Sequence, residues 1–406
     1  MWLFYYRGVL IIIFYYKCLQ SIIISLSGKI FPHNSYGYAC GIFYPPPHTD
    51  IFRSLSYTKP IIRTPLYELL YYFCKKILIL KKILIIRFSS IGDIVLTTPV
   101  LRCLKQQINS VEIHFLTKKQ FFPLLQNNPN IDKIHFIEKR LKEVIPQLKS
   151  KKFDYIIDLH KNIRSISVIL RLRKPFSTFK KLNLKKWLLT NFKINLLPKI
   201  HIVDRYMKAA KHFNIKNDYK GLDYFIPKDE EINIDCLPQS HQKGYIGFVI
   251  GAKHITKQLP ENKIISVCQK INKPIVLLGD ERDRKNGEVI KKIVGDKIFN
   301  ACGLYNINQS ASLIKQAEKI ITTDTGLMHI AAALKKDILS IWGNTVPEFG
   351  MYPYFSKDAQ DKSKIIENKN LSCRPCSKLG FKKCPKKHFK CMNLIDEQEI
   401  IKWIKN

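Results

Sequence analysis

An acidic residue follows the first clear strand pattern of the chain, in the stretch IIRFSSIGDIVLTTPV (residues 85–100). An apolar run leads into a small polar loop, then Gly92 and Asp93, then a helical pattern. A carboxylate at a helix start can cap the free N–H groups there, or it can act as a general base that takes a proton from an acceptor hydroxyl. This stretch alone favours the cap, and only a substrate site facing it would favour the base.

A second strand end, in TTDTGLMHIAAAL (322–334), has the composition of an anion site. Backbone N–H groups near Gly326, at the start of a helix, can bind phosphate without hindrance from a side chain. The hydroxyls of Thr323 and Thr325 can add donors. Asp324 would repel a phosphate, so it is better suited to accept hydrogen bonds from sugar hydroxyls.

Two further residues belong to the same expected site. A lone helical histidine is usually structural, but His329 lies one turn from the predicted phosphate end. Lys257, in GAKHITKQLP, precedes the helix-starting Pro260 and can neutralise a diphosphate leaving group, with a solvated loop lysine as the alternative. The segment GDERD follows the next strand, where an acidic residue commonly holds ribose hydroxyls in nucleotide-binding folds.

Alternating strands and helices must position these stretches. Apolar runs of strand length recur at 82–88, 111–117, 131–137, 153–160, 244–250, 274–279, 297–302, 319–324 and 337–343. Helical patterns lie between them, in the basic segment RSISVILRLRK and at 201–215, 259–271, 281–293, 306–318 and 327–335. The alternation predicts an α/β protein with parallel sheets. Ligands of such sheets bind at the carboxyl ends of the strands, so the chemistry is expected in a cleft between two domains.

A polar, proline-containing stretch marks the boundary between the two domains. We expect an N-terminal Rossmann-like acceptor domain over residues 82–235, a linker over 236–243 and a C-terminal Rossmann-like donor-nucleotide domain over 244–385. Residues 386–406 form a tail that ends in an amphipathic helix. Residues 1–81 are an N-terminal extension.

Three interpretations of the extension stay open. Residues 9–26 have about the length of a marginal membrane-spanning helix, interrupted by polar residues. The same run is compatible with a signal peptide that ends after small residues. Alternatively, translation starts near residue 82, although no methionine lies between Met1 and Met207.

The composition points to an anionic partner. The chain has 406 residues and 46% hydrophobic residues, enough for two domains. Its 68 Lys+Arg against 32 Asp+Glu give a formal charge of +36, which favours nucleic acid, an anionic membrane or a phosphorylated glycolipid. The alternative is compositional drift in a chain rich in Lys, Ile and Asn. The scattered cysteines indicate a reducing compartment.

A C-terminal segment, CRPCSKLGFKKCPKKHFKC, contains Cys373, Cys376, Cys384 and Cys391. The pattern resembles a structural zinc site with His388 as a spare ligand. The spacing of six residues in the second pair is wide for zinc, which favours unligated thiols. The lysines around the cysteines can contact lipid phosphates at a membrane surface.

Four stretches resemble, in order and spacing, the motifs of the lipopolysaccharide heptosyltransferases, glycosyltransferase family 9. They are FSSIGDIVLTTP, GAKHITKQLP, TTDTGLMHIAAAL and WGNTVPEFGMYPY, and the resemblance covers about residues 82–395. It implies a GT-B architecture, in which two Rossmann-like βαβ domains face each other across a cleft. It further implies an inverting mechanism, an ADP-heptose donor and an acceptor sugar in the Kdo–lipid A or inner-core region of lipopolysaccharide.

The resemblance also implies residue roles. Asp93 matches the family's proposed catalytic base. The donor-binding positions are Lys257, Glu281, Asp324, Thr325, Gly326 and His329. The acceptor-binding positions are Ser90, Gly92, His160, Asn162 and Arg164. The chain departs from the family at Lys161 and Asn162, where smaller or apolar residues are expected, and at Gln258 and Leu259, where an aromatic often precedes the proline. These departures leave the acceptor's identity more open than the reaction type.

In the mechanism that these residues predict, Asp93 deprotonates the acceptor hydroxyl, which attacks the anomeric carbon of the donor. Lys257 and the N–H groups near Thr325 and Gly326 stabilise the departing diphosphate. Because no Asp-x-Asp pair stands at a strand end in either site region, we expect no catalytic metal, and we expect no cofactor. The expected partners are ADP-heptose, a lipopolysaccharide precursor and the inner-membrane surface, not nucleic acid. The protein is expected to be a monomer in the cytoplasm, peripheral on the inner face of the inner membrane.

Other functions remain as alternatives. One is a glycosyltransferase of the same fold that uses another nucleotide sugar. Another is a basic nucleic-acid- or membrane-binding protein without catalysis, including an adaptor stapled by zinc. The ordered strand-end motifs have no explanation under the non-catalytic alternatives.

Overall fold

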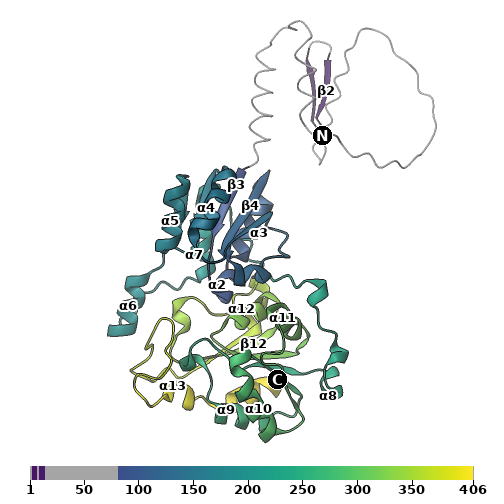
Figure 1. Ribbon diagram of the computed structural model, residues 1–406, viewed down its shortest axis with the longest axis vertical. Helices are drawn as coiled ribbons and strands as arrows, with labels where there is room; N and C mark the ends of the chain where they lie inside the picture. Colours follow the sequence, from purple (N-terminus) through teal and green to yellow (C-terminus); the bar gives the residue numbers. More distant parts are fainter. Residues whose placement is uncertain (1, 7–8, 14–80, 406) are drawn as a thin grey trace, which may run out of the picture. The chain divides into compact units, whose positions relative to one another are not determined.

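The structure, a computed structural model, describes residues 2–6, 9–13 and 81–405 (Figure 1). The chain divides into two compact units, Met1–Glu68 and Leu69–Asn406. None of the helices that the structure describes is long and apolar enough to cross a bilayer.

In the first unit, strands β1 (Trp2–Tyr6) and β2 (Val9–Ile13) pair antiparallel. The interpretation of residues 9–26 as a spanning helix is therefore wrong for Val9–Ile13. That segment is mostly β-branched, and β-branched side chains favour an extended backbone. The rest of that run lies outside the described residues.

The N-terminal half of the second unit contains a five-stranded parallel sheet, ordered β5-β4-β3-β6-β7. Its strands are β3 (Lys81–Ile86), β4 (Val111–Lys118), β5 (Lys133–Ile137), β6 (Tyr155–Asp158) and β7 (Phe176–Thr178). The apolar run Ile83–Ile86 is fully buried, as expected for a central strand covered on both faces. Sequence reasoning missed β7, because this short edge strand is only partly buried and its residues do not alternate.

The C-terminal half contains a six-stranded parallel sheet, ordered β10-β9-β8-β11-β12-β13. Its strands are β8 (Ile246–Val249), β9 (Ile275–Leu278), β10 (Ile298–Asn300), β11 (Lys319–Thr323), β12 (Asp337–Trp342) and β13 (Ser363–Glu367). The prediction of parallel sheets in an α/β protein is thus confirmed. The edge strand β13 was missed for the same reason as β7, since most of its residues are half-buried.

Helices alternate with these strands. They are α2 (Ile91–Val95), α3 (Thr98–Gln107), α4 (Leu141–Ser150), α5 (Ile163–Leu172), α6 (Asn183–Phe192), α7 (Ile202–Ala209), α8 (Gln239–Gln242), α9 (Glu261–Lys270), α10 (Arg284–Val294), α11 (Ile307–Gln316), α12 (Gly326–Ala333), α13 (Lys390–Asn393) and α14 (Glu397–Lys405).

Two helices differ from their predicted extents. The helix predicted over 201–215 ends at Ala209 and is followed by a 3₁₀ turn over Lys211–Phe213, in which His212 stacks on Tyr155 with ring centroids 4.7 Å apart. The helix predicted over 281–293 begins at Arg284, after a 3₁₀ turn that Asp280 caps. The amphipathic pattern of α6 is weak, and this helix was not predicted.

The strand order reverses once in each sheet. In the first sheet the reversal lies between β3 and β6, and in the second it lies between β8 and β11. The loops that leave these four strands carry Asp93, His160, Lys257 and Asp324. Ligands of open parallel sheets bind at such reversals, so the fold places these four residues where a site is expected.

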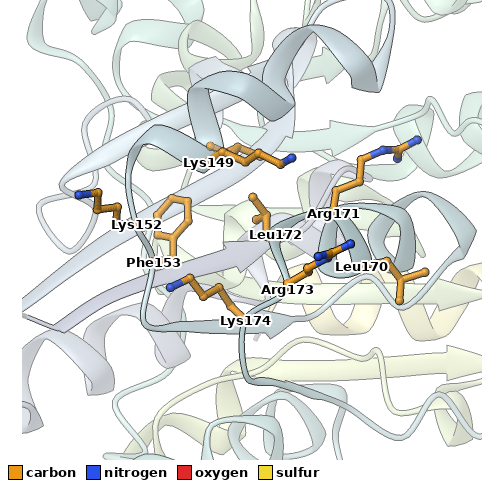
Figure 2. Close-up of a pocket in the computed structure, with 9 residues that line it drawn as sticks. Lys149, Lys152, Phe153, Leu170, Arg171, Leu172, Arg173 and Lys174 are labelled. Atoms are coloured by element: carbon orange, nitrogen blue, oxygen red, sulfur yellow. The ribbon is translucent and has the colours of Figure 1, made fainter.

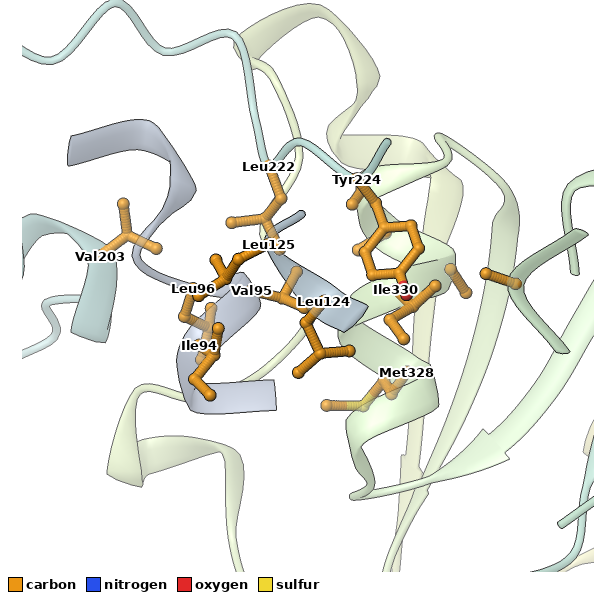
Figure 3. Close-up of a cluster of buried hydrophobic side chains, with 14 of the residues drawn as sticks. Ile94, Val95, Leu96, Leu124, Leu125, Val203, Leu222, Tyr224, Met328 and Ile330 are labelled. Atoms are coloured by element: carbon orange, nitrogen blue, oxygen red, sulfur yellow. The ribbon is translucent and has the colours of Figure 1, made fainter. Parts of the chain in front are cut away.

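A continuous apolar core joins the two sheets' helices (Figure 3). Ile94 and Val95 of α2 and Met328 and Ile330 of α12 belong to one buried cluster, although they come from opposite halves of the chain. Each is at most 2% exposed. Burial of one such side chain contributes about 1.5–3 kcal/mol, so this contact fixes α2 against α12 and with it the loops that carry Asp93 and Asp324.

A cavity of about 520 Å³ lies elsewhere, at the C-terminal ends of α4 and α5 (Figure 2). Helices of a parallel α/β unit run opposite to the strands. This cavity therefore lies at the N-terminal ends of the strands, away from the loops after β3 and β6. Its cations are Lys149, Lys152, Arg171, Arg173 and Lys174.

His201 caps α7 with its imidazole ring. Its Nδ1 accepts a hydrogen bond from the N–H of Val203 (3.2 Å), while Nε2 lies 2.9 Å from the carbonyl oxygen of Tyr352. The neutral ring with its proton on Nε2 satisfies both contacts, whereas a protonated ring would direct a second N–H at the Val203 donor. Burial lowers the pKa of His201 to about 3.

We expect His201 to make the protein less stable in mild acid. Its pKa falls from 6.5 in the unfolded chain to about 3 in the fold, so below pH 6.5 the unfolded chain binds a proton that the folded chain does not. The free energy of unfolding then falls by about 1.4 kcal/mol per pH unit through this group. His201→Asn keeps a capping acceptor without titrating and should flatten the slope by that amount in denaturant titrations at about pH 4 to 6. His212→Asn, at an exposed position, is the control and should leave the slope unchanged. If His201→Asn has the same slope as the wild type, the assignment is contradicted.

Candidate active site

Asp93 occupies the third position of α2, and its carboxylate turns back over the start of the helix. Its Oδ2 accepts hydrogen bonds from the Ser90 hydroxyl (2.7 Å) and from the Ser90 N–H (3.2 Å). The capping role considered for Asp93 is thus present, with Ser90 as the N-cap residue and the acid completing the box. Because the cap uses one carboxylate oxygen, it does not exclude a second role.

Arg87 holds the other oxygen of this carboxylate. Its Nη2 lies 2.6 Å from Oδ1 of Asp93. The remaining guanidinium nitrogens donate to the carbonyl oxygens of Ser89 (2.7 Å) and Leu159 (2.5 Å) and to the hydroxyl of Tyr206 (2.9 Å). Every guanidinium nitrogen of Arg87 thus has a partner, and the buried side chain positions Asp93.

The environment keeps Asp93 ionised. Burial alone would raise the pKa of Asp93, but the Arg87 guanidinium and the hydrogen bonds from Ser90 outweigh it, so the pKa is lowered. A carboxylate has about four lone-pair positions, and the contacts within residues 81–405 take three of them. The position left on Oδ1, in a side chain that is 21% exposed, can accept a proton from a substrate hydroxyl.

In the C-terminal half, Lys257 and Asp324 meet across the strand reversal. Lys257 Nζ lies 2.6 Å from Asp324 Oδ2, and the Thr345 hydroxyl donates to the same oxygen at 2.8 Å. An ammonium has three donors, so Lys257 keeps donors for an anionic ligand. The pair also reduces the repulsion that Asp324 would exert on a phosphate.

The two threonines beside Asp324 differ in their bonding. Thr325 is the N-cap of α12, and its hydroxyl oxygen accepts from the N–H of Met328 (3.4 Å). Thr323 is buried, and its hydroxyl has no hydrogen-bond partner in the part of the chain that the structure describes. Thr325 therefore shapes the helix start, whereas Thr323 is enclosed at the end of β11.

Two glycines allow α2 and α12 to meet directly. A Cβ atom on Gly92 would lie 2.3 Å from Cδ2 of His329, and one on Gly326 would lie 2.7 Å from Cβ of Ile91. Real Cβ contacts are not this short, so both positions exclude a side chain. The backbone before Asp93 therefore packs on α12, which brings Asp93, His329 and the start of α12 into one site.

The site also contains two neutral histidines. Burial lowers the pKa of His329 to about 4, although Asp324 and Asp93 act in the opposite direction. Burial, followed by the charge of Arg87, lowers the pKa of His160 to about 3. In both rings Nδ1 is buried without a hydrogen-bond partner among the described residues. Both imidazoles can therefore bind a hydroxyl without adding charge.

Three of the predicted site residues take less central places. Asn162 caps α5, with its side-chain oxygen accepting from the N–H of Ser165 (2.9 Å). Arg164 is exposed on the first turn of α5. The side chain of Glu281 is 71% exposed and lies 3.8 Å from Arg284. Glu281 follows β9, two strands from β11, so about 10 Å separate its strand from the one that precedes Asp324.

Sequence reasoning missed several residues of the site. Arg87 and Tyr206 reach Asp93 only through contacts between distant segments. Arg205 is 4% exposed and donates from Nη2 to the carbonyl oxygen of Phe349 (2.8 Å), while its Nε and Nη1 have no partner among residues 81–405. Lys186 Nζ lies over the ring of Phe349, 5.5 Å from the ring centroid. The one available signal was charge inside apolar patterns, as for Arg87 in IIRF.

The C-terminal cysteines are free thiols in the structure. Within the described residues, no three His, Cys, Asp or Glu side chains are placed to hold a metal ion. Cys376 Sγ donates to the carbonyl oxygen of Cys373 (3.1 Å), and Cys373 Sγ lies 3.8 Å from His388 Nε2. Burial raises the pKa of Cys376 to about 12 and that of Cys391 to about 11, which keeps both as thiols. The arrangement lends no support to the zinc alternative.

Comparison with known proteins identifies the family. A family model described as glycosyltransferase family 9 (heptosyltransferase) matches residues 141–389. Lipopolysaccharide heptosyltransferase 1 of Campylobacter coli is 25% identical over 358 residues, which are 80% of this chain and 98% of that protein.

Solved structures show the same architecture. The glycosyl transferase family 9 protein of Veillonella parvula DSM 2008 superposes with a TM-score of 0.65 at 21% identity, over 80% of this chain and 96% of that one. The ADP-heptose lps heptosyltransferase II of E. coli gives 0.62 at 21% identity, over 80% and 97%. The chain therefore has the GT-B fold of a glycosyltransferase and belongs to glycosyltransferase family 9, the heptosyltransferase family.

Proposed function

We propose that this chain transfers a heptosyl group from ADP-heptose to an inner-core or Kdo–lipid A sugar of a lipopolysaccharide precursor, with inversion at the anomeric carbon. The observation that carries the proposal is the junction of α2 and α12. It brings a carboxylate with a free lone pair within reach of a lysine–aspartate pair at a helix start. The names of the relatives support the sugar and the acceptor class.

On the acceptor side, residues 82–235 are proposed to hold the sugar that is glycosylated. The acceptor hydroxyl gives its proton to Oδ1 of Asp93, and its oxygen forms the new bond to the anomeric carbon. Arg87 and Ser90 fix the carboxylate while this happens. Ser90, Gly92 and His160 line the same loops and would contact the acceptor.

On the donor side, residues 244–385 are proposed to hold the nucleotide sugar. The bond between the anomeric carbon and the phosphate oxygen breaks, and the electron pair leaves with ADP. Lys257 and the N–H groups at the start of α12 stabilise that charge, which makes a metal-independent reaction the natural proposal. Asp324 and His329 would accept hydrogen bonds from the sugar, and Glu281 would hold the ribose.

Arg205 and Lys186 suggest how the acceptor is recognised. A buried guanidinium with free N–H donors and no carboxylate partner is costly, so an anionic ligand would stabilise it. Burial and the charge of Arg205 lower the pKa of Lys186 to about 8, and the charge of Asp93 also acts on Lys186. The charges of Arg205 and Asp93 both act on Lys186, and we propose that Arg205 and Lys186 together bind the carboxylate of the acceptor sugar.

Replacing Arg205 with glutamine should raise the KM for the acceptor about 10- to 100-fold with little change in donor affinity. The range corresponds to one charge-assisted hydrogen-bond contact of about 1.5–3 kcal/mol. Steady-state kinetics with a Kdo-containing acceptor and with the same acceptor as its methyl ester measures this. The variant should lose its defect with the ester, because the esterified carboxylate no longer carries the charge that Arg205 is proposed to bind. An equal defect with both acceptors would contradict the assignment.

A transfer assay tests the function itself. The purified chain is incubated with a Kdo-containing lipid A acceptor and ADP-heptose, ADP-glucose, GDP-mannose or UDP-glucose, and nucleoside diphosphate release is followed. Release with ADP-heptose that requires the acceptor is expected. Release with another donor alone would show that the fold uses a different sugar, and no release with any donor would refute the proposal.

A further inference from the structure

A long segment of the part of the chain that the structure describes contains no acidic residue. Between Asp158 and Asp204 the sequence contains no Asp or Glu. The same stretch has eleven cations, namely Lys161, Arg164, Arg171, Arg173, Lys174, Lys180, Lys181, Lys185, Lys186, Lys193 and Lys199. None of them forms an ion pair within residues 81–405. We call residues 161–199, which include α5 and α6, the α5–α6 face.

The same face carries exposed apolar side chains. Of the 17 large hydrophobic residues that are exposed in the described part of the chain, nine lie here. They are Ile163, Ile166, Leu170, Phe176, Leu184, Trp187, Phe192, Ile194 and Leu196. More than half of the exposed large hydrophobic side chains thus lie on about a tenth of the described residues. Scattered exposed apolar residues need no explanation, but a concentration like this marks an interaction surface.

Helix α5 has two opposite apolar stripes. Its inner stripe, which includes Val168 and Leu172, is buried against the sheet. Ile163, Ile166 and Leu170 follow the i, i+3, i+7 spacing of a second stripe, and they are 87%, 47% and 68% exposed. In Figure 1 both α5 and α6 lie on the left edge of the second unit, and no element covers α5 on its outer side there.

The cavity at the end of α5 extends the face. Leu170, Arg171, Arg173 and Lys174 line it from the α5 side, while Lys149 of α4 and Lys152, two residues after α4, line it from the other side (Figure 2). The cationic side chains surround apolar lining residues that include Phe153. In such an arrangement, lysine and arginine at the edge of an apolar surface can reach lipid phosphates. The neighbouring apolar side chains can then enter the boundary between head groups and acyl chains.

The C-terminal cysteine segment continues the face at its other end. Lys193, just after α6, donates to the carbonyl oxygens of Cys373 (3.2 Å) and Pro375 (2.8 Å). The positive charge of Lys378 acts on both Lys181 and Lys186. Leu379 and Phe381, which follow Lys378 closely in the chain, are exposed. Elements from both halves of the second unit therefore present cations and apolar side chains together.

We propose that the α5–α6 face, with the cysteine segment at its edge, docks the enzyme on the surface of an anionic phospholipid bilayer. Its cations complement the phosphates, and its exposed apolar side chains insert at the boundary of head groups and acyl chains. A second copy of the chain is a poor occupant, since eleven cations would face eleven cations. Nucleic acid would satisfy the cations but would leave the aliphatic stripe of α5 exposed.

The α5–α6 face lies close to the candidate active site, and the role that we infer for docking rests on the proposed function. The face begins at Lys161, directly after His160, and the charge of Asp93 acts on Lys181 and Lys186. A sugar acceptor anchored in the bilayer by its lipid would thus reach Asp93 from the bound surface. Vesicle binding can be measured without any transfer reaction, so the two proposals can fail separately.

Cosedimentation of the full chain with vesicles tests the proposal. The probes are phosphatidylcholine alone and an equal mixture of phosphatidylcholine and phosphatidylglycerol. We expect at least 10-fold stronger binding to the anionic vesicles. Ile163→Ser/Ile166→Ser/Leu170→Ser and, separately, Arg171→Glu/Arg173→Glu/Lys174→Glu should each weaken it at least 10-fold. The wild-type tryptophan emission should shift to the blue on anionic vesicles, and Trp187→Phe should lose most of that shift.

Helix α10 supplies matched controls on another surface. Val289→Ser/Ile293→Ser removes exposed apolar side chains, and Lys285→Glu/Lys291→Glu/Lys292→Glu makes the same charge change. Both should bind vesicles within 2-fold of the wild type, and all variants should keep the thermal shift that ADP produces. If the α10 charge variant loses as much vesicle binding as the α5 charge variant, net charge alone explains the binding and the proposal is overturned. Duplex DNA that binds more tightly than vesicles and displaces them, with an affinity that Ile163→Ser/Ile166→Ser/Leu170→Ser leaves unchanged, would assign the face to nucleic acid instead.

Discussion

Replacing Asp93 with asparagine should lower the kcat of heptosyl transfer by about 100- to 10,000-fold, the usual contribution of a general base. Asparagine keeps the shape of the side chain and an oxygen for the Ser90 contacts, but it cannot take the acceptor's proton. The KM for ADP-heptose should change little, because the donor is proposed to bind to Lys257 and the start of α12. Initial rates of ADP release with a saturating acceptor measure the effect.

Two controls separate catalysis from folding in this prediction. Ser90→Ala removes one hydrogen bond to Asp93 and should cost much less activity than Asp93→Asn. Asp132→Asn removes an exposed ion pair with Lys105 in the same domain and should leave the rate within 2-fold. If Asp93→Asn is folded and as active as Asp132→Asn, the carboxylate is only a helix cap.

The second large effect is expected at Lys257. Lys257→Ala removes the cation that faces the departing diphosphate and should lower kcat/KM for the donor about 100- to 1000-fold, as for loss of a charge-stabilising donor at a leaving oxyanion. Lys253 is exposed in the same loop, and Lys253→Ala is the matched control. ADP affinity by calorimetry should fall with Lys257→Ala and stay unchanged in the control.

The ion pair with Asp324 permits a sharper version of that test. If Lys257 served only to neutralise Asp324, then Lys257→Ala/Asp324→Asn would recover most of the activity, because no uncompensated carboxylate would remain beside the phosphates. Direct action on the diphosphate predicts that the double variant stays about as slow as Lys257→Ala. Recovery to near the wild-type rate would contradict the assigned role.

Local patterns were enough to predict the sheets but not their edges. The run Ile83–Ile86 could only be a buried strand, and its pairing on both sides follows from that. Strands β7 and β13 are short or half-buried, so no alternation or apolar run distinguishes them from loops. Helix α6 is exposed on most sides and lacks a clear apolar stripe.

The candidate site was predictable where strand ends carry it, as at Asp93, Lys257 and Asp324. The groups that tune it come from far along the chain. The guanidinium of Arg87 reaches the carbonyl of Leu159 and the hydroxyl of Tyr206, and only the folded sheet brings these together. A sequence pattern gives no information about such pairs, because the intervening residues fix no distance between them.

The two glycines show a different limit. Gly326 was interpreted as space for a phosphate, and the resemblance gave Gly92 as an acceptor-binding position. In the fold each also makes room for the opposite helix, Gly326 for Ile91 and Gly92 for His329. A glycine in a sequence indicates a position where a side chain would not fit, and only the structure shows which neighbour occupies that space.

The most direct test of the central claim is the anomeric configuration of the product, determined by NMR after incubating the full chain with ADP-heptose and a Kdo-containing acceptor. A single displacement with Asp93 as base predicts one new heptosyl linkage whose anomeric configuration is opposite to that of the donor. A product that retains the donor's configuration, or the absence of a heptosylated product, would contradict the account.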